Sequence, residues 1–397
     1  MSHFYTCSYN ESPELKVAEA FRSPLHIVDV TLREGQQAPG VAFSPKGELA
    51  VVGALAAAGV NLVQAGYAVR DDSTVVRLRR HFPDSRLAVL AVGWTPELTA
   101  DALRATREAG ASVCSILMRS APKHLANLGL SEADAVRIVA ESTARAKLAG
   151  FDEVIVAPSF ATLADFSLLL RLFDAGLGEG ASVISIADST GIAKPSAVGW
   201  MVRRLRERYG DDVGIKLHMH NDYGLALGNT LSGLEAGADW VDVSVLGLGE
   251  RAGNCATEQL IVALAGLYGI DTGIDPTAMT VVCQQVASLS GMSVPPMQPV
   301  VGGNVFSNKL ELHVKAIATD PTLLEPYDPA AVGGRRTLRL GRGSGPTAVR
   351  LKAAELGLVV SDEMVDDLVT TINERAVDDS EVTDKVFAEM ITGSSAR

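Results

Sequence analysis

The sequence predicts an α/β fold, a (β/α)₈ TIM barrel followed by a small, mostly helical C-terminal region. Eight short apolar segments alternate with segments of helical periodicity between residue 26 and about residue 268, and a barrel of this kind needs about 250 residues. After about residue 272 the alternation stops and a stretch rich in Pro and Gly follows. These observations predict an N-terminal extension over 1–25, a barrel over 26–272, a linker over 273–304 and a helical region over 305–397.

The predicted strands are short, rich in Val, Ile and Leu, and bounded by Gly, Asp or Ser, as buried parallel strands are. In chain order they are His26–Val30, Leu62–Gly66, Leu87–Val92, Val113–Met118, Glu153–Ala157, Ser182–Ala187, Gly214–Met219 and Trp240–Val245. An open, doubly wound sheet also alternates strands with helices. Such a sheet usually has a glycine-rich phosphate turn after its first strand, whereas TLREGQQ follows here. The closed barrel is therefore favoured.

The predicted helices have apolar residues every three or four positions. The clearest in the barrel are Pro45–Ala58, Thr99–Ala109, Ser131–Ala149 and Lys194–Tyr209, and each is followed by a glycine, which suits the left-handed residue that ends a helix. In the C-terminal region, Thr347–Leu356 and Ser361–Glu374 have the same periodicity. This region is too small to bury a large core, so we expect it to pack on the barrel or on a second chain.

Composition excludes several classes of function. The chain has 35 Lys and Arg against 47 Asp and Glu, a formal charge of −12, which argues against a nucleic-acid surface and against attraction to anionic lipid. No apolar run is long enough to span a membrane, and the N-terminal residues lack the pattern of a signal peptide. The four cysteines form no Cys-x-x-Cys pair, so we expect free thiols in a cytoplasmic protein.

Polar residues gather where the predicted strands end, which is where a (β/α)₈ barrel carries its active site. They are Asp29, Arg33, Glu34 and Gln37 after the first strand; Arg119, Ser120 and His124 after the fourth; Asp188, Ser189 and Thr190 after the sixth; His218, His220, Asn221 and Asp222 at the seventh; and Glu250, Arg251 and Asn254 after the eighth.

The pair His218 and His220 is the sharpest of these signals. Residues two apart in a strand point to the same face, and two imidazoles at the barrel mouth can bind one divalent ion. The alternative is a hydrogen-bonded polar pair at a strand end. Glu34 is the nearest third ligand, and Asn254 could reach the same ion. Arg33 is either a surface ion pair with Glu34 or a guanidinium that stabilises negative charge on a carbonyl oxygen.

Three longer motifs carry a resemblance to known proteins. They are DVTLREGQQAPGVAFS, HMHNDYGLALGNTLSGLEAGADWVDVSVLGLGERAGN and VVGGNVFSNKLELHVKAI. Together they resemble the homocitrate synthase and 2-isopropylmalate synthase family, part of a metal-dependent barrel superfamily that also contains 3-hydroxy-3-methylglutaryl-CoA lyase. The resemblance runs from about residue 25 to 375, and the length and the stretch HVKAIATDPTLLEPYDPAAVG are most similar to homocitrate synthase.

The resemblance implies an aldol–Claisen condensation of acetyl-CoA with a 2-oxo acid, followed by thioester hydrolysis, on a divalent ion (Zn²⁺, Mn²⁺ or Mg²⁺). It implies a homodimer in which the C-terminal region contributes to the partner's active site. By motif position the implied roles are metal ligands for Glu34, His218, His220 and Asn254; ketone polarisation for Arg33; proton transfer for His313; substrate binding for Gln37, His124, Asp188 and Ser189; and a loop at the mouth for Glu250 and Arg251.

The sequence also departs from the family pattern. The Glu-Asp pair expected after the fifth strand is absent, and Leu324 stands where homocitrate synthase has a tyrosine. With Arg70, Arg119, Lys123 and His124 near the mouth, we expect a 2-oxo acid with a second anionic group, such as 2-oxoglutarate, oxaloacetate or phosphonopyruvate. The alternatives are a 2-isopropylmalate or citramalate type of synthase, an acyl-CoA lyase, and a catalytically silent metal-binding relative. Cys255 follows Asn254 rather than preceding it, which disfavours the lyase.

Overall fold

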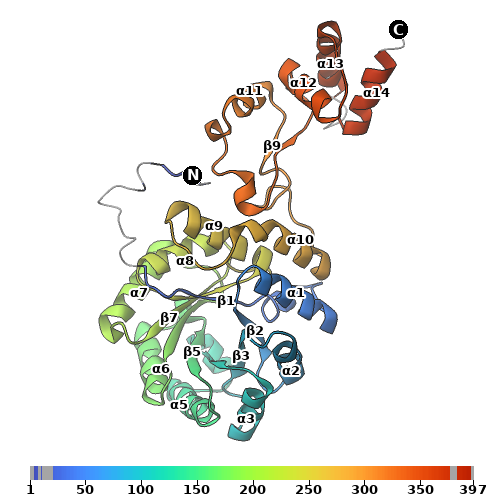
Figure 1. Cartoon of the computed structure of the whole chain (residues 1–397). Helices are drawn as coiled ribbons and strands as arrows, with labels where there is room; N and C mark the ends of the chain where they lie inside the picture. The colour runs from blue at the N-terminus through green and yellow to red at the C-terminus, as the bar shows by residue number, and fades with distance from the viewer. Residues whose placement is uncertain (1–3, 8–9, 11–20, 376–381, 395–397) are drawn as a thin grey trace. The chain divides into compact units, whose positions relative to one another are not determined.

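The computed structural model describes residues 4–7, 10, 21–375 and 382–394, and the chain forms two compact units, 8–293 and 1–7 with 294–397. The first unit is a closed barrel of eight parallel strands, which confirms the predicted fold (Figure 1). Most of the predicted extension 1–25 lies outside the described residues. The strands are β1 His26–Asp29, β2 Leu62–Tyr67, β3 Arg86–Val92, β4 Val113–Arg119, β5 Glu153–Ser159, β6 Val183–Asp188, β7 Gly214–Met219 and β8 Trp240–Val243.

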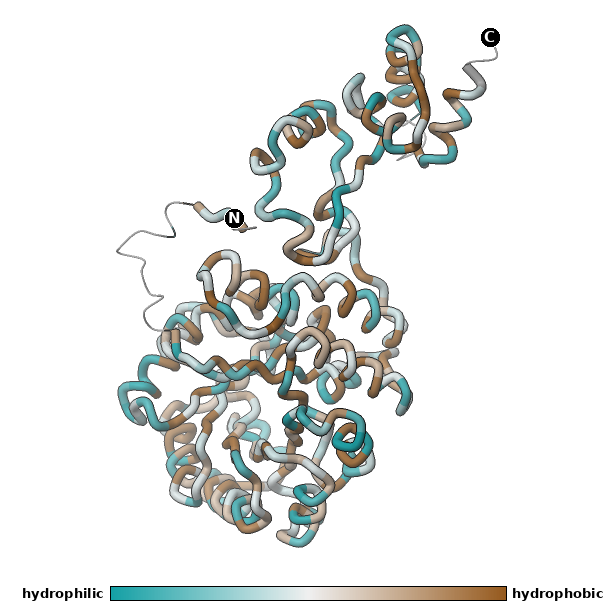
Figure 2. The backbone as a smooth tube through the Cα atoms, viewed as in Figure 1, coloured by the Kyte–Doolittle hydropathy of each residue, from teal (hydrophilic) through white to brown (hydrophobic). Residues whose placement is uncertain are grey.

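The strands follow the predicted segments, with differences only at their ends. Alternate side chains point into the barrel, and one buried layer there contains Val28, Val30, Leu62, Ala88, Val113, Ile155, Val183 and Trp240. In Figure 2 much of the tube inside the barrel is brown, the colour of hydrophobic residues. β4 and β5 run past their predicted ends because Arg119 and Ser159 are still paired in register. This longer pairing carries two polar residues to the barrel mouth.

Ten α-helices are described in the barrel unit. They are α1 Pro45–Ala57, α2 Asp72–His81, α3 Ala100–Ala109, α4 Pro122–Asn127, α5 Glu132–Leu148, α6 Phe166–Gly178, α7 Pro195–Tyr209, α8 Ala226–Glu235, α9 Thr257–Leu267 and α10 Met279–Ser290. α3 and α5 begin one residue later than predicted because Thr99 and Ser131 are their N-caps, with side-chain oxygens that accept a hydrogen bond from the first turn.

Helix α10 lies inside the segment 273–304 that the sequence predicts as a linker. It packs against α1, and it buries Val282, Cys283 and Val286. These apolar residues recur every three or four positions, as in an amphipathic helix. Most of the prolines and glycines that suggest a linker lie after α10.

The second unit has a small core of its own. It contains α11 Glu311–Thr319, α12 Pro346–Glu355, α13 Asp362–Arg375, α14 Asp384–Ser394 and a short parallel pair, β9 Ser307–Asn308 with β10 Thr337–Leu338. The residues buried in its core include Val349, Leu368 and Phe387. Phe4 joins this unit, because it forms a β-bridge with Tyr327. Among the described residues of both units, no helix is long and apolar enough to cross a membrane.

Two glycines of α6 provide a matched test of the packing between helix and barrel. A Cβ added at the buried Gly176 would lie 2.2 Å from Cγ2 of Val156 in β5, whereas one added at Gly178 would meet nothing within 4 Å. We expect Gly176→Ala to lower the free energy of unfolding by about 1–3 kcal/mol through overpacking. Gly178→Ala should leave it unchanged or raise it by up to about 1 kcal/mol. Urea denaturation of both variants measures this, and equal effects would contradict the close contact between α6 and β5.

Candidate metal centre and its cavity

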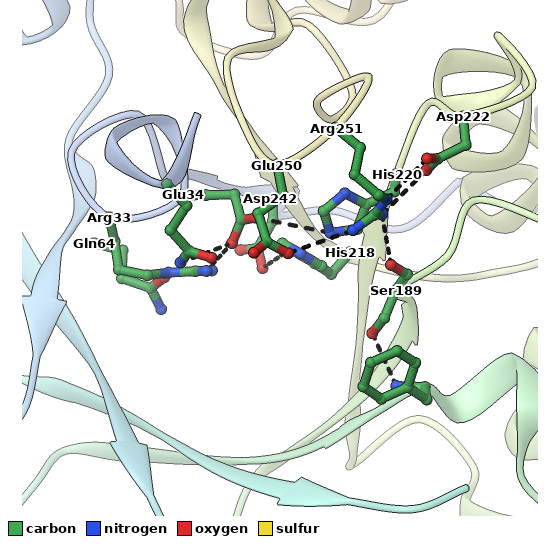
Figure 3. A network of polar contacts seen from close by, with 12 residues as sticks. Arg33, Glu34, Gln64, Ser189, His218, His220, Asp222, Asp242, Glu250 and Arg251 are labelled. Atoms are coloured by element: carbon green, nitrogen blue, oxygen red, sulfur yellow. Dashed lines mark hydrogen bonds and ion pairs between the residues drawn. The ribbon is translucent and has the colours of Figure 1, made fainter. Parts of the chain in front are cut away.

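The structure brings Glu34, His218 and His220 together at the barrel mouth. Glu34 follows β1, His218 lies in β7, and His220 comes directly after that strand. One ligand atom from each residue lies within 4.8 Å of the others, and Figure 3 shows the three side chains converging. A carboxylate with two imidazoles is a common donor set for a divalent ion, and it leaves positions open for water or substrate.

A carboxylate fixes the orientation of His218. Its Nδ1 lies 3.0 Å from Oδ2 of Asp242, and Nζ of Lys216 lies 2.7 Å from Oδ1 of the same carboxylate. Burial alone would raise the pKa of Asp242, but the charge of Lys216 and the hydrogen bond from His218 outweigh it and lower this pKa to about 2. An ionised Asp242 therefore accepts a hydrogen bond from Nδ1–H of His218 and leaves the Nε2 lone pair of this histidine free for a metal.

His220 is ready to act as a neutral ligand. Burial, together with the charges of the nearby His218 and Arg251, lowers the pKa of its imidazole to about 3. Within the part of the chain that the structure describes, Nδ1 of His220 is buried and has no hydrogen-bond partner. Buried polar atoms are seldom left without a partner, so this imidazole fits a ligand that comes from outside the chain.

Asn254 has the same property. Its amide oxygen and nitrogen are both buried, and neither has a hydrogen-bond partner among the described residues. A β-bridge joins Asn254 to His220. A Cβ at Gly249 would lie 2.7 Å from Nδ2 of Asn254 and 3.3 Å from Cγ of Glu34, so a glycine is needed for the loop to pass between these side chains. The orphaned atoms of Asn254 and His220 thus support a divalent ion bound by the predicted ligands.

Arg33 lies beside this cluster and is held in place by its neighbours. Its guanidinium is buried, forms an ion pair with Glu34, and donates from Nε to Oε1 of Gln64 at 2.6 Å. Gln37 lies next to the same carboxylate, with Nε2 3.4 Å from Oε2 of Glu34 and 3.2 Å from the hydroxyl of Tyr67. The cluster therefore presents a fixed positive charge next to the candidate metal ligands.

These side chains line a cavity of about 200 Å³ at the barrel mouth. Glu250 and Arg251 border it, and Arg251 donates to the carbonyl oxygen of Ser189 at 2.6 Å and to Oδ1 of Asp222 at 2.8 Å (Figure 3). Those contacts join the loop after β8 to the ends of β6 and β7. Besides Glu250 and Arg251, the residues that line the cavity include Arg33, Glu34, Gln37, Gln64, Ser115, Arg119, Ser159, Phe160, Ser185, Lys216, His218, His220 and Asp242. The volume suits a small polar substrate.

Four residues predicted for the site are not among those that line this cavity: Asn254, described above, and His124, Asp188 and His313. The ring of His124 stacks on Phe160 with 3.7 Å between ring centroids. The carboxylate of Asp188 accepts from Oγ1 of Thr162 at 2.7 Å and from the backbone N–H of Ala193 at 3.0 Å, so it stabilises the loop after β6. His313 is an exposed residue of α11 in the second unit.

The sequence interpretation missed Gln64, Lys216 and Asp242, which line the cavity from inside the barrel. A signal was present in the sequence. Each is a polar residue within an otherwise apolar strand, and Lys216 lies two positions before His218, on the same face.

Comparison with known proteins places these motifs in a family context. Residues 24–286 match the HMGL-like family, and residues 300–380 match the homocitrate synthase post-HMGL domain-like family. A homocitrate synthase of Methanopyrus kandleri is 32% identical over 366 residues, which cover 92% of this chain and 91% of that protein. A 2-isopropylmalate synthase of Sulfolobus acidocaldarius is 30% identical over 360 residues, which cover 90% of this chain and 92% of the relative.

Solved structures show the same fold. The HMG-CoA lyase of Bacillus subtilis matches with a TM-score of 0.61 and 21% identity, covering 69% of this chain and 96% of the lyase. An HMG-CoA lyase from Acinetobacter baumannii, in complex with coenzyme A and 3-methylmalate, matches with a TM-score of 0.59 and 24% identity, covering 68% of this chain and 92% of that one.

The metal cluster makes a direct prediction. We expect the protein to bind one divalent ion, and we expect His218→Ala and His220→Ala to abolish stoichiometric binding because each removes one ligand. Asp242→Asn should weaken binding by about 10- to 100-fold, since it disturbs only the orientation of His218. Chelator competition with Zn²⁺ and Mn²⁺ measures these affinities.

The control for this experiment is His81→Ala, which removes an exposed histidine of α2 and should leave binding unchanged. Full occupancy of one site in His218→Ala, or no bound ion in the unmodified protein, would contradict the assignment.

Proposed function

The chain belongs to the HMGL-like family, and from this premise we propose that it is an acyltransferase that condenses acetyl-CoA with a 2-oxo acid. The products are CoA and a 2-hydroxy dicarboxylate or tricarboxylate. The observation that carries the proposal is the convergence of Glu34, His218 and His220 with Arg33 around one small cavity. Relatives named homocitrate synthase and 2-isopropylmalate synthase support it over nearly the whole chain.

The first half of the mechanism needs a chelated substrate. A divalent ion held by Glu34, His218 and His220, with Asn254 as a further donor, would supply Lewis acidity toward the 2-oxo acid. Arg33 is positioned to stabilise the negative charge that develops on the ketone oxygen while the new C–C bond forms. Its hydrogen bond to Gln64 holds the guanidinium in place before the substrate arrives.

The second half needs a base and a water molecule. We assign to the imidazole of His313 the removal of a proton from the acetyl methyl group, because a neutral histidine is an effective base near neutral pH. The resulting enolate carbon attacks the ketone carbon, and water then cleaves the thioester, which releases CoA and a new carboxylate. We propose that His313 reaches the barrel of a partner subunit and that the protein is therefore a homodimer with shared active sites.

The nearest alternative is an acyl-CoA lyase that runs the reverse cleavage, since the two solved neighbours described above are lyases. A lyase of this superfamily would use a cysteine at the mouth. Here Cys255 is buried, and burial raises the pKa of its thiol to about 12. Such a thiol is a poor acid–base group at neutral pH, which favours the condensing reaction.

We expect the protein to release CoA from acetyl-CoA only when a 2-oxo acid is present. Arg33→Gln should lower kcat by about 10²- to 10³-fold by removing charge stabilisation at the ketone oxygen, without loss of the bound metal ion. A thiol-release assay coupled to product identification measures both effects. Arg80→Gln, on the exposed side of α2, is the control and should retain full activity. Equal activity in Arg33→Gln would exclude the assigned role.

His313→Ala should lower kcat by about 10²- to 10⁴-fold while metal and 2-oxo acid still bind, as expected for loss of a general base. Mixing His313→Ala with Glu34→Ala subunits should restore part of the activity, because one active site of each mixed dimer then contains both intact residues. Lys315→Ala, on the same helix, is the control. A fully active monomer, or inactive mixed dimers of demonstrated composition, would show that the sites are not shared.

A further inference from the structure

Arg119 is a cation that lines the cavity and has no carboxylate partner among the described residues. We propose that Arg119 determines substrate specificity by binding the second anionic group of the 2-oxo acid, a terminal carboxylate or phosphonate. This inference rests on the proposed function for the reaction and adds to it the class of acceptor: 2-oxo acids with an anion at both ends.

Two aromatic rings fix the position of the Arg119 guanidinium. Its Cζ lies 5.5 Å from the ring centroid of Trp94 and 5.0 Å from that of Phe160. These residues follow β3 and β5, the two strands that flank β4, which Arg119 ends. Cation–π contacts of this kind hold the plane of an arginine while its N–H groups stay free to donate hydrogen bonds.

The Phe160 ring is itself secured. The His124 ring stacks on it with an interplanar angle of 19°. The backbone N–H of Phe160 donates to Oγ of Ser189 at 2.8 Å. Phe160 has a φ of 61°, a left-handed conformation that is uncommon for a bulky residue and persists only where the surroundings impose it. His124, which the sequence places in substrate binding, is thus a positioning residue that acts through Phe160.

The charges around the cavity single out Arg119. Four cationic side chains line it, and three of them have carboxylate partners: Arg33 pairs with Glu34, Lys216 with Asp242, and Arg251 with Asp222 and Glu250. For Arg119, no hydrogen bond or ion pair is found among the described residues, and its guanidinium contacts only aromatic rings. A guanidinium has five N–H donors, so an anion in the cavity would complete this site.

The location fits a substrate with two charged ends. Arg119 ends β4, whereas the candidate metal ligands come from β1 and β7. In a ring of eight strands, β4 is three strands away from each of these two. The metal cluster and the free guanidinium therefore face the same cavity of about 200 Å³ from different walls. The hydroxyl of Ser189 also lines the cavity and accepts from the N–H of Phe160, so its own hydrogen remains for an anion, whereas that of Ser159 is donated to the carbonyl oxygen of Met118 at 3.3 Å.

The test compares two acids with equal numbers of carbon atoms, 2-oxoglutarate and 2-oxopentanoate, which differ in a terminal carboxylate or methyl group. Calorimetry on the metal-loaded protein without acetyl-CoA measures their binding, and CoA release measures turnover. We expect the unmodified protein to bind 2-oxoglutarate at least 10-fold more tightly. Arg119→Met should weaken that binding about 10- to 100-fold, the loss typical of a charged hydrogen bond, and should leave 2-oxopentanoate binding unchanged.

Oxaloacetate against 2-oxobutanoate, and phosphonopyruvate as a third dianion, then establish which acceptor length and which anion the site prefers. Arg104→Met is the matched control, since it removes an exposed arginine of α3. Phe160→Leu keeps the guanidinium but removes one ring, and should give a smaller change in the same direction. Arg119→Lys keeps the charge, so it serves where Arg119→Met fails to fold.

The outcomes separate the two proposals. If no 2-oxo acid promotes CoA release or binds, the proposed function itself is wrong. If 2-oxo acids bind and react but Arg119→Met weakens both members of the pair equally, or raises only the KM for acetyl-CoA, then Arg119 has a structural or CoA-binding role and the specificity assignment is overturned. The same holds if the unmodified protein prefers 2-oxopentanoate.

Discussion

Closure of the barrel between β1 and β8 is the constraint on which the site depends. The two strands pair over four residues, and a buried hydrogen-bond chain extends the seam beyond them. Oγ1 of Thr31 donates to Asp29 at 3.0 Å and accepts from the N–H of Val245 at 2.9 Å, and Thr257 donates to the same carboxylate. This chain fixes the loop after β1, which carries Glu34, against the loop after β8, which carries Asn254.

The fold could be predicted because parallel barrel strands are buried on both faces and appear as short apolar runs. The gathering of Glu34, His218 and His220 followed from topology alone. Side-chain direction beyond the strand ends could not be predicted in this way: Asp188 turns back to hold the loop after β6, and His124 packs on Phe160. The role of Lys216 could not be predicted either, because its carboxylate partner, Asp242, lies in a different strand.

The pairing of buried charges explains which residues are structural and which remain available. Removing a charge from water is costly unless a partner compensates. Lys216 and Asp242 neutralise each other, and Asp242 also holds His218, so these two charges are not available to bind a ligand. Arg119 obtains its stabilisation from aromatic faces instead, and this leaves its hydrogen-bonding edge for a ligand.

This difference divides the barrel mouth into two walls with separate tasks. The wall of β7, β8 and β1 carries the candidate metal ligands and is tied together by the buried seam, so substitutions there disturb the chemistry itself. The wall of β3, β4 and β5 holds Arg119, because its guanidinium contacts the rings of Trp94 and Phe160. Neither of these contacts involves a candidate metal ligand. Under the proposed function, the preference for one 2-oxo acid can therefore change on this second wall while the reaction on the first wall is kept.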